Sequence, residues 1–285
     1  MRQAVTIALC LSCALVIAGC NKGPSNSQID KTLKDVNVID ETNLNEVMLQ
    51  SADPDEAVSY FQRASAQYPD RIDFKRGLAT SLVRAKKPNA AAAAWADVLA
   101  MPAATLDDRV DYADALIRSN EWDKAAAELN KIPPTHETFK RYRLEAMVAD
   151  SKKQWKKADS FYDIAVGLTT KPSGTLNNWG FSKLTRGDYA GAEKLFGEAL
   201  VYEPSLFTAK NNLVLARAAQ HNYDMPVVEM TQTERAELLY TAALAAIKQG
   251  DVTIGKGLLQ QAIDTHPQYF EAAVRSLNAL DSKQN

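Results

Sequence analysis

Residues 177–204 read NNWGFSKLTRGDYAGAEKLFGEALVYEP, and their pattern decides the fold. The first half of the stretch carries a small residue, Gly180, and a glycine–aspartate turn separates it from the second half. In the second half, Ala192, Phe196 and Ala199 follow the i, i+4, i+7 spacing of one helix face. A proline ends the stretch. These residues predict two antiparallel helices that approach each other closely.

The same pattern recurs along the chain with a nearly fixed period. Alanines follow one another at intervals of 34, 34, 33 and 34 residues, at Ala57, Ala91, Ala125, Ala158 and Ala192. A bulky apolar residue stands four positions after each of them, at Phe61, Trp95, Leu129, Tyr162 and Phe196. An aromatic residue often precedes the alanine by three positions and closes the preceding turn, as at Trp122, Trp155 and Tyr189. A period of this length indicates an all-α helical solenoid.

This pattern closely resembles the tetratricopeptide repeat (TPR), which has two antiparallel helices per 34 residues. The resemblance implies a right-handed superhelix of helical hairpins. Small residues such as Gly180 and Ala192 then stand where two helices touch, and bulky residues fill the space between units. The alternative is an amphipathic bundle with chance alanine spacing, but several positions agree over five successive units. Because each unit buries its apolar face only against its neighbours, the expected product is a long curved binding surface.

We place the solenoid at residues 36–285, with units starting near residues 38, 72, 106, 139, 173, 207 and 236. In the sixth unit, Pro226 stands where the alanine belongs. Met225–Met230 is therefore predicted to be an irregular insertion that replaces the second helix. Thr231 and a glutamate three residues later form a capping box for a new helix. Gln268–Leu280 is predicted to cap the last apolar face.

The N-terminus resembles a bacterial lipoprotein signal over residues 1–19. Arg2 precedes an apolar run of 15 residues, whereas a membrane span needs about 20. The run ends in Ile17-Ala18-Gly19-Cys20. In such a signal two small residues precede the cysteine that is linked to diacylglycerol, so the resemblance implies that Cys20 is the lipidated first residue. An ordinary signal peptide with a chance cysteine, or anchoring by the apolar helix itself, are the alternatives.

Residues 20–35 are then a lipidated flexible tether, since Gly23 and Pro24 lie among polar residues. The several acyl chains of a mature lipoprotein anchor it stably. Asn21 follows, where enterobacterial lipoproteins kept in the inner membrane have aspartate. We therefore expect an outer-membrane location on the periplasmic face. The covalent lipid on Cys20 is the only cofactor expected, and no thiol remains for a disulfide.

Composition and motifs argue against several other classes of function. The net charge of −2 provides no basic surface for nucleic acid. Gly250, Gly255 and Lys256 have the spacing of a phosphate-binding loop, but Gly257 stands where serine or threonine would hold magnesium. The repeat pattern explains both glycines as a turn and a helix contact. The three histidines are scattered singly, so we expect no metal site, no enzyme and no small-molecule substrate.

The concave groove remains as the candidate site, and in the TPR family the first helix of each unit forms it. In the N-terminal half, the corresponding positions are mostly charged: Asp73, Arg76, Asp107, Asp114, Arg143 and Asp150. In the C-terminal half they become amide and apolar: Asn177, Phe181, Leu184, Asn211, Leu215, Tyr240 and Leu244. Apolar anchors with amides beside them suit an extended or helical peptide, although the apolar residues could equally belong to the core. The C-terminal set together with Arg143 is our candidate partner-binding groove.

The whole arrangement resembles the TadD-type lipoprotein of the tight-adherence (Flp) pilus assembly system. The distinctive part is the C-terminal third, in the segments Asn211–Leu213, Met230–Leu239, Ala245–Gly250, Gly257–Leu259 and His266–Glu271. The resemblance implies an envelope partner, the outer-membrane secretin, whose localisation or assembly the protein assists as pilotins do. Two other roles remain open: the TPR lipoprotein of outer-membrane β-barrel insertion, and a scaffold for peptidoglycan enzymes.

Overall fold

The computed structural model describes residues 44–282. The predicted signal peptide, Cys20, the tether and the start of the predicted first helix lie outside the described residues. Residues 44–50 are helical. The helices that follow are α2 (Pro54–Gln67), α3 (Ile72–Arg84), α4 (Pro88–Leu99), α5 (Leu106–Arg118), α6 (Trp122–Leu129), α7 (Phe139–Ser151), α8 (Trp155–Gly167), α9 (Ser173–Thr185), α10 (Tyr189–Tyr202), α11 (Phe207–Ala218), α12 (Gln232–Gln249), α13 (Val252–Thr265) and α14 (Glu271–Asp281). No strand occurs between residues 44 and 282.

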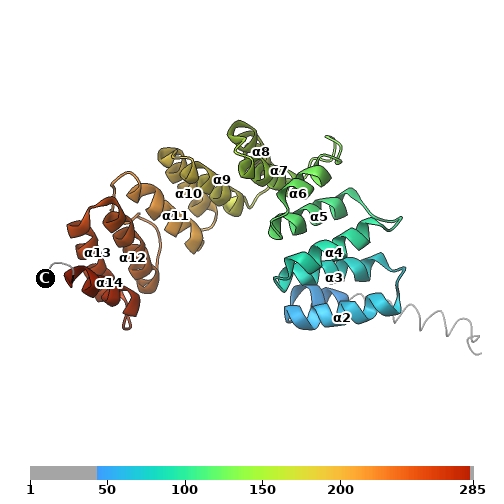
Figure 1. The fold of residues 1–285 in the computed structure, drawn as a ribbon, viewed down its shortest axis with the longest axis horizontal. Coiled ribbons are helices and arrows are strands. Elements are labelled where there is room, and N and C mark those ends of the chain that lie inside the picture. Colours follow the sequence, from blue (N-terminus) through green and yellow to red (C-terminus); the bar gives the residue numbers. More distant parts are fainter. Residues whose placement is uncertain (1–43, 283–285) are drawn as a thin grey trace, which may run out of the picture.

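The helices form an arch of antiparallel pairs, as the all-α solenoid prediction requires (Figure 1). The pairs α3–α4, α5–α6, α7–α8 and α9–α10 each make one unit, and consecutive units stack side by side. The five periodic alanines lie in the second helices and are all 0% exposed. Where the helices of a unit touch, a Cβ added to Gly180 would lie 2.6 Å from a ring carbon of Phe196. Only glycine fits this contact.

The sixth unit lacks its second helix, as predicted. After α11, residues 219–231 run without a helix or strand as a strap beside α12 and α13. The strap packs Tyr223, Met225 and Met230 against the buried cluster of the last units. Thr231 then forms the predicted capping box with Glu234, and α12 begins at Gln232. This start lies four residues before the expected unit start near 236, because the capping box begins the helix.

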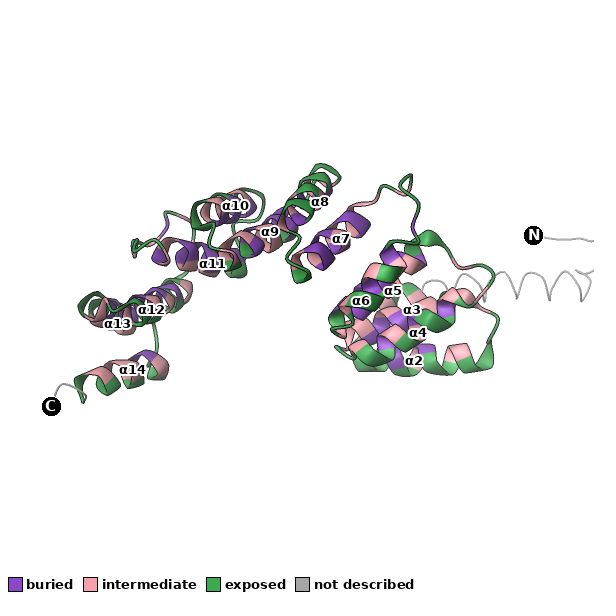
Figure 2. Ribbon diagram, turned by 45° about the horizontal axis from the view of Figure 1, so that its top comes forward, coloured by how far each residue is buried: buried purple, intermediate pink, exposed green. Residues whose placement is uncertain are grey.

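The C-terminal capping helix is present but starts later than predicted. α14 begins at Glu271 rather than at Gln268. His266 precedes a proline and has an extended backbone with ψ 130°, which delays the turn into the helix. Ala273 is fully buried, and Leu277 and Leu280 pack against the last cluster. The rest of α14 faces outward, so it closes the solenoid (Figure 2).

The junction between the fourth and fifth units combines a stack of Tyr162 on Trp179, with ring centroids 6.0 Å apart, with several polar contacts to Asp159 of α8. Arg186 Nη2 donates to both of its carboxylate oxygens at 2.6 and 2.8 Å, and Trp179 Nε1 donates at 2.6 Å. Lys183 Nζ lies 3.5 Å from the same carboxylate. The helices α9, α10 and α11 share a larger apolar cluster around Phe196, and from α8 only Val166 packs against it. We call the α8–α9 contact the polar junction.

The two glycines of the phosphate-loop pattern have the structural roles that the repeat predicts. Gly250 ends α12 in the left-handed conformation with φ 93°. Gly255 lies in α13, where an added Cβ would approach Ile247 of α12 to 2.4 Å. Lys256 Nζ lies 2.8 Å from an Asp281 carboxylate oxygen on the capping helix. No feature of this segment forms a phosphate cradle.

Candidate functional site

Most of the predicted groove residues line two neighbouring hollows in the C-terminal half. The first hollow, of about 560 Å³, lies among α7, α8, α9 and α11 and the start of α6, and it includes Asn177 and Phe181. The second, of about 690 Å³, lies among α9, α11 and α12 and includes Leu184 and Leu215, with Tyr240 and Leu244. Phe181 and Leu184 are three residues apart on α9, so they share one helix face. The hollows therefore adjoin along this helix.

The apolar groove residues divide into solvent-facing and core-packed side chains. Phe181 is 52% exposed and Leu244 is 42% exposed, so a ligand could cover both. Leu184 and Tyr240 are partly buried and pack against core clusters. Tyr240 also lies 5.4 Å from the ring centroid of Phe270 and within 3.3 Å of the Ser276 hydroxyl. This tyrosine therefore holds the last units together.

Side-chain amides follow the same helices as the apolar residues. Asn212 Nδ2 donates to Asn177 Oδ1 at 3.0 Å, and Thr241 donates to Asn211 Oδ1 at 2.8 Å. The Asn178 side chain lines the first hollow and forms no hydrogen bond to another side chain or to the backbone among residues 44–282. Amides in such places can bond the backbone of an extended peptide. Asn211 lines neither hollow, but it accepts the hydrogen bond from Thr241, and Thr241 lines the second hollow.

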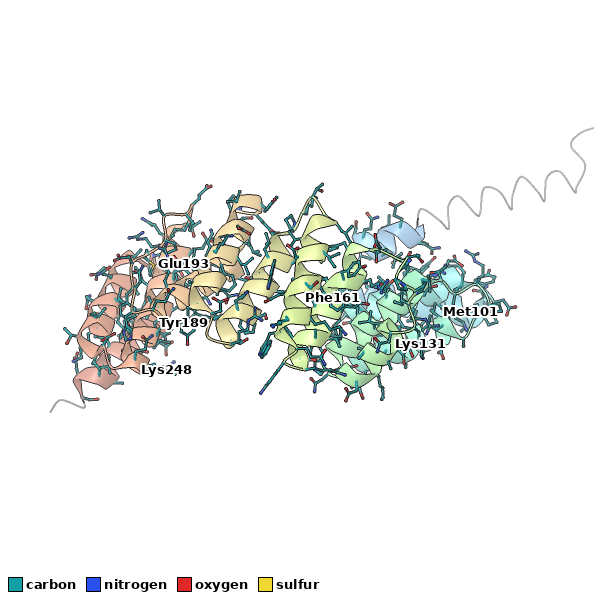
Figure 3. The ribbon with its side chains drawn as sticks, turned by 90° about the horizontal axis from the view of Figure 1, so that it is seen from above. Met101, Lys131, Phe161, Tyr189, Glu193 and Lys248 are labelled. Carbon is teal, nitrogen blue, oxygen red and sulfur yellow. The ribbon has the colours of Figure 1, made fainter. Side chains whose placement is uncertain are left out.

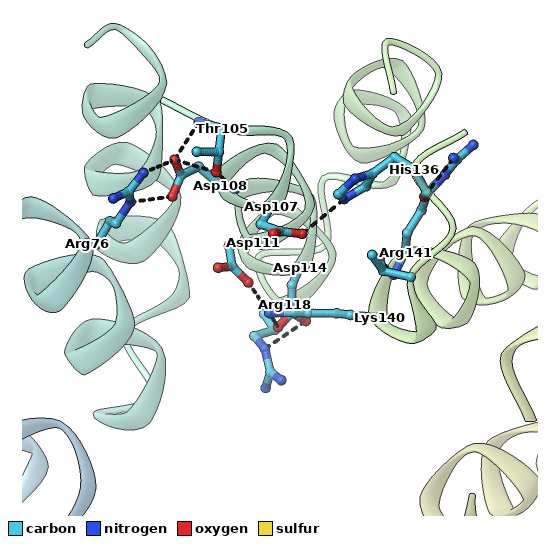
Figure 4. A network of polar contacts seen from close by, with 11 residues as sticks. Arg76, Thr105, Asp107, Asp108, Asp111, Asp114, Arg118, His136, Lys140 and Arg141 are labelled. Atoms are coloured by element: carbon cyan, nitrogen blue, oxygen red, sulfur yellow. Dashed lines mark hydrogen bonds and ion pairs between the residues drawn. The ribbon is translucent and has the colours of Figure 1, made fainter. Parts of the chain in front are cut away.

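Most of the N-terminal charges predicted for the groove pair with neighbouring side chains outside the predicted set (Figure 4). Arg76 Nε lies 2.7 Å from Asp108, and His136 Nε2 lies 3.0 Å from Asp107. Asp73 pairs with Arg71 at 2.6 Å. Further contacts in the same part of the chain join Arg118 to Asp114 and Lys140 to Asp111 and Asp114.

The pKa values of these carboxyls follow from the same contacts. Burial opposes ionisation of Asp108, but hydrogen bonds from Arg76 and Thr105 outweigh it and lower the pKa of this carboxyl. Burial raises the pKa of Asp111, against the opposite effect of Lys140. Since most of these charges already have partners, this half of the surface presents little net charge to a ligand.

Two charged residues differ from this pattern. Arg143 has a buried Nε without an acceptor, and its guanidinium carbon lies 5.7 Å from the centroid of the Phe139 ring. Asp150 accepts hydrogen bonds from Tyr162 at 2.9 Å and Ser182 at 2.7 Å, and it lines the first hollow. Burial raises the pKa of the Asp150 carboxyl, although both hydrogen bonds favour its ionised form. Burial and the adjacent Asp150 also raise the pKa of the Tyr162 hydroxyl.

Sequence reasoning missed the aromatic side chains of the first hollow. The repeat pattern predicts that Trp122 and Trp155 close the turns before their helices. The structure also places both side chains on the wall of the hollow with Phe181. A third hollow of about 870 Å³ lies beneath the strap and is lined by Pro226 and Val228 together with Ile254. The second hollow has Tyr189 and Lys248 at its edge, on the same side of the C-terminal half (Figure 3).

Neither a metal site nor a membrane-spanning helix occurs among residues 44–282. No group of three or more histidine, cysteine, aspartate or glutamate side chains could hold a metal ion there. Within the same range, none of the helices combines the length and apolar character needed to cross a membrane.

Family comparisons recognise the repeats. Two sequence models of the tetratricopeptide repeat match the chain, over residues 48–108 and 237–269. No curated protein matches the sequence. The chain therefore contains TPR units near both ends of the solenoid, and the comparisons indicate no enzyme family.

Solved structures show the same fold at low sequence identity. A TPR protein from Parabacteroides merdae is 13% identical with a TM-score of 0.55, covering 83% of this chain and 95% of that one. The C-terminal part of a TPR protein from Cytophaga hutchinsonii is 14% identical with a TM-score of 0.52, covering 82% and 98%. The APC/C hetero-tetramer Cut9–Hcn1 is 14% identical with a TM-score of 0.58, covering 82% and 47%, so this chain spans about half of that one. The fold is a TPR superhelix, the architecture of protein-interaction scaffolds.

Proposed function

We propose that this chain is an outer-membrane lipoprotein that binds a segment of another envelope protein and assists assembly of the Tad (Flp) pilus secretin. The observation that carries the proposal is the pair of adjoining hollows along α9, with exposed apolar side chains and amides together. Such a surface suits a peptide, because apolar anchors supply affinity and amides satisfy its backbone. The paired charges of the N-terminal half offer no comparable site.

The proposed membrane anchor is the lipid on Cys20. The lipobox-like Ile17-Ala18-Gly19-Cys20 supports acylation of this thiol, and Asn21 supports sorting to the outer membrane. A tether at residues 20–35 would hold the solenoid on the periplasmic face while leaving its groove accessible. The membrane is then a partner through the lipid alone.

The secretin as partner is supported by the resemblance of the C-terminal third to TadD-type proteins. That third includes the strap and α12, and α12 carries Tyr240 and Leu244 of the second hollow. Crosslinking from the groove in cells decides among the partners. Recovery of a secretin supports the proposal. Recovery of the β-barrel insertion machinery or of peptidoglycan hydrolases would contradict the secretin as partner and support one of the two other roles.

Replacing apolar groove residues that lie outside the core clusters is expected to weaken partner binding. Phe181, Leu215 and Leu244 line the hollows, and buried anchors of this kind commonly contribute about 2 kcal/mol each. A Phe181→Ser, Leu215→Ser, Leu244→Ser variant should therefore bind the secretin at least a hundredfold more weakly in a co-precipitation titration. Tyr240 is left unchanged because it packs against the core.

The matched control replaces two exposed apolar residues outside both hollows. Val201 is 80% exposed and Val227 is fully exposed, so Val201→Ser with Val227→Ser should leave binding unchanged. Circular dichroism checks that both variants keep their helices. Equal binding by the two variants, with normal secretin multimers and surface pili, would place the binding site on another face of the solenoid.

Cys20→Ala tests the anchor. Removing the thiol removes the acyl acceptor, so the chain should lose its lipid, keep its signal segment and leave the outer-membrane fraction. Mass spectrometry of the mature N-terminus and membrane fractionation measure both effects. Cys13→Ala, within the signal segment, is the control and should change neither. Unchanged mass and fractionation of Cys20→Ala would exclude lipidation at this residue.

A further inference from the structure

The first hollow contains one carboxyl side chain in an otherwise neutral lining. Trp122, Trp155 and Phe181 provide aromatic surface, and serine, threonine and asparagine side chains provide most of the rest. Asp150 is the only charged residue among those that line it. The hollow measures about 560 Å³, within the range of about 300–1,000 Å³ that is usual for ligand sites.

The Asp150 carboxylate is held in place by neutral donors alone. The Tyr162 hydroxyl donates to Oδ2 at 2.9 Å and the Ser182 hydroxyl donates to Oδ1 at 2.7 Å. Each oxygen keeps a further acceptor site. Among residues 44–282, no lysine, arginine or histidine forms an ion pair with this carboxylate. The donors fix its direction without neutralising its charge.

Arg143, on the same helix as Asp150, acts through space on the Tyr162 hydroxyl, and its Nε has no acceptor among the described residues. The other cations of this region have partners elsewhere. Arg186 and Lys183 contact Asp159 across the polar junction, and Lys183 also lies 3.0 Å from Asp188. Lys152, which follows α7, lies 2.9 Å from Asp123. Arg186 acts on Asp150 only through space and partly offsets the effect of burial on the pKa of this carboxyl, so a cation in direct contact with Asp150 would have to come from a ligand.

The aromatic wall favours the same ligand. Indole and phenyl faces attract ammonium and guanidinium groups, and the methylene stem of a lysine or arginine packs well on them. Trp155 already receives one such cation, since the Arg186 guanidinium carbon lies 5.6 Å from its ring centroid. The amides of Asn178 and Asn212 lie in the same hollow, where they can bond the backbone beside that side chain.

We infer that the first hollow is a specificity pocket for a basic side chain, lysine or arginine, of the bound peptide. The cationic group lies against Asp150, and the stem lies between the tryptophans and Phe181. This inference rests on the proposed peptide-binding function and narrows its ligand: the partner segment carries a basic residue at the position that enters the first hollow.

The test uses the full-length protein in non-ionic detergent, labelled with 5-fluorotryptophan, so that its four tryptophans are resolved by ¹⁹F NMR. The probes are capped heptapeptides that differ only at the central residue, which is lysine, Nε-acetyl-lysine, norleucine or glutamate. We expect the lysine peptide to shift the signals of Trp122 and Trp155, with at least tenfold tighter binding than the other three. Trp95, which is 3% exposed in another cluster, is the internal reference.

Asp150→Asn keeps the size of the side chain and should remove the tenfold preference for lysine. Asp163→Asn, on the exposed side of α8, is the matched control and should retain it. Equal binding of the lysine and norleucine peptides to the unmodified chain overturns the inference without any variant. An unchanged preference of Asp150→Asn for the lysine peptide also overturns the inference. The absence of any change in the ¹⁹F signals of Trp122 and Trp155 has the same consequence.

The two proposals fail in different ways. If the triple groove variant loses the secretin while no lysine preference exists, only the specificity pocket is wrong. If the lysine preference depends on Asp150 while the secretin binds the triple variant normally, the pocket stands and the partner is another protein.

Discussion

An Asp159→Ala variant is expected to unfold in two steps. Asp159 accepts hydrogen bonds from Arg186 and from the Trp179 indole across the polar junction. The Arg186 side chain is only 12% exposed. Removal of the Asp159 carboxylate therefore leaves a nearly buried guanidinium without its ion-pair partner, which costs about 3–5 kcal/mol. Since each unit of a solenoid contacts only its neighbours, this loss should uncouple α9–α14 from the preceding units.

Urea titrations followed by circular dichroism and by tryptophan fluorescence measure the effect, because the two signals should no longer coincide. Asp163→Ala is the matched control: it lies one turn further along α8, is exposed and forms no ion pair within the described residues. The control should follow the unmodified chain. A single coincident transition of Asp159→Ala at the unmodified midpoint would show that the polar junction is not the weak contact of the solenoid.

A Gly180→Leu variant is expected to lose about 3 kcal/mol of stability or more. Even a Cβ at this position would lie 2.6 Å from a ring carbon of Phe196, which is fully buried and has no space to move. Overpacking of this kind commonly costs about 1–3 kcal/mol, and a leucine adds further atoms to the same contact. Thermal unfolding and urea midpoints give the change.

Gly197→Leu, in the same unit, is the matched control and is expected to change the stability in the opposite direction. An added Cβ at Gly197 meets no atom within 4 Å, so the substitution should gain up to about 1 kcal/mol from helix propensity. The two variants share the same chemical change and differ only in the contact. Similar midpoints for both would contradict the assignment of Gly180 to the helix–helix contact.

The sequence predicted the fold because the repeat depends on local spacing. The periodic alanines and the bulky residues four positions later are buried in the predicted manner, with Phe61 and Phe196 at 1% and 0% exposure. Pro226 marked the missing helix because proline cannot continue one. Helix ends were less predictable, and the start of α14 shifted by three residues after His266 and Pro267.

The candidate site was only partly predictable, because it depends on how one unit is rotated against the next. The sequence left open whether the apolar groove residues face a ligand or the core: in the structure Phe181 and Leu244 are about half exposed, whereas Tyr240, at another position of the repeat, packs against Phe270. Spacing assigned Asp150 to a charged N-terminal surface. Only the structure shows that Ser182, 32 residues later, holds this carboxylate inside the first hollow.

The polar junction has a mechanical consequence for a chain held at both ends. A lipid at the N-terminus and a partner in the C-terminal half would pull in opposite directions whenever the partner moves. Hydrogen bonds such as Arg186–Asp159 weaken steeply with small displacements, whereas apolar clusters keep part of their contact while sliding. Force should therefore separate α8 from α9 before it unfolds any unit. That separation would draw Asp150 on α7 away from Ser182 on α9 and open the first hollow, while the second hollow, built from α9, α11 and α12, keeps its hold on the partner.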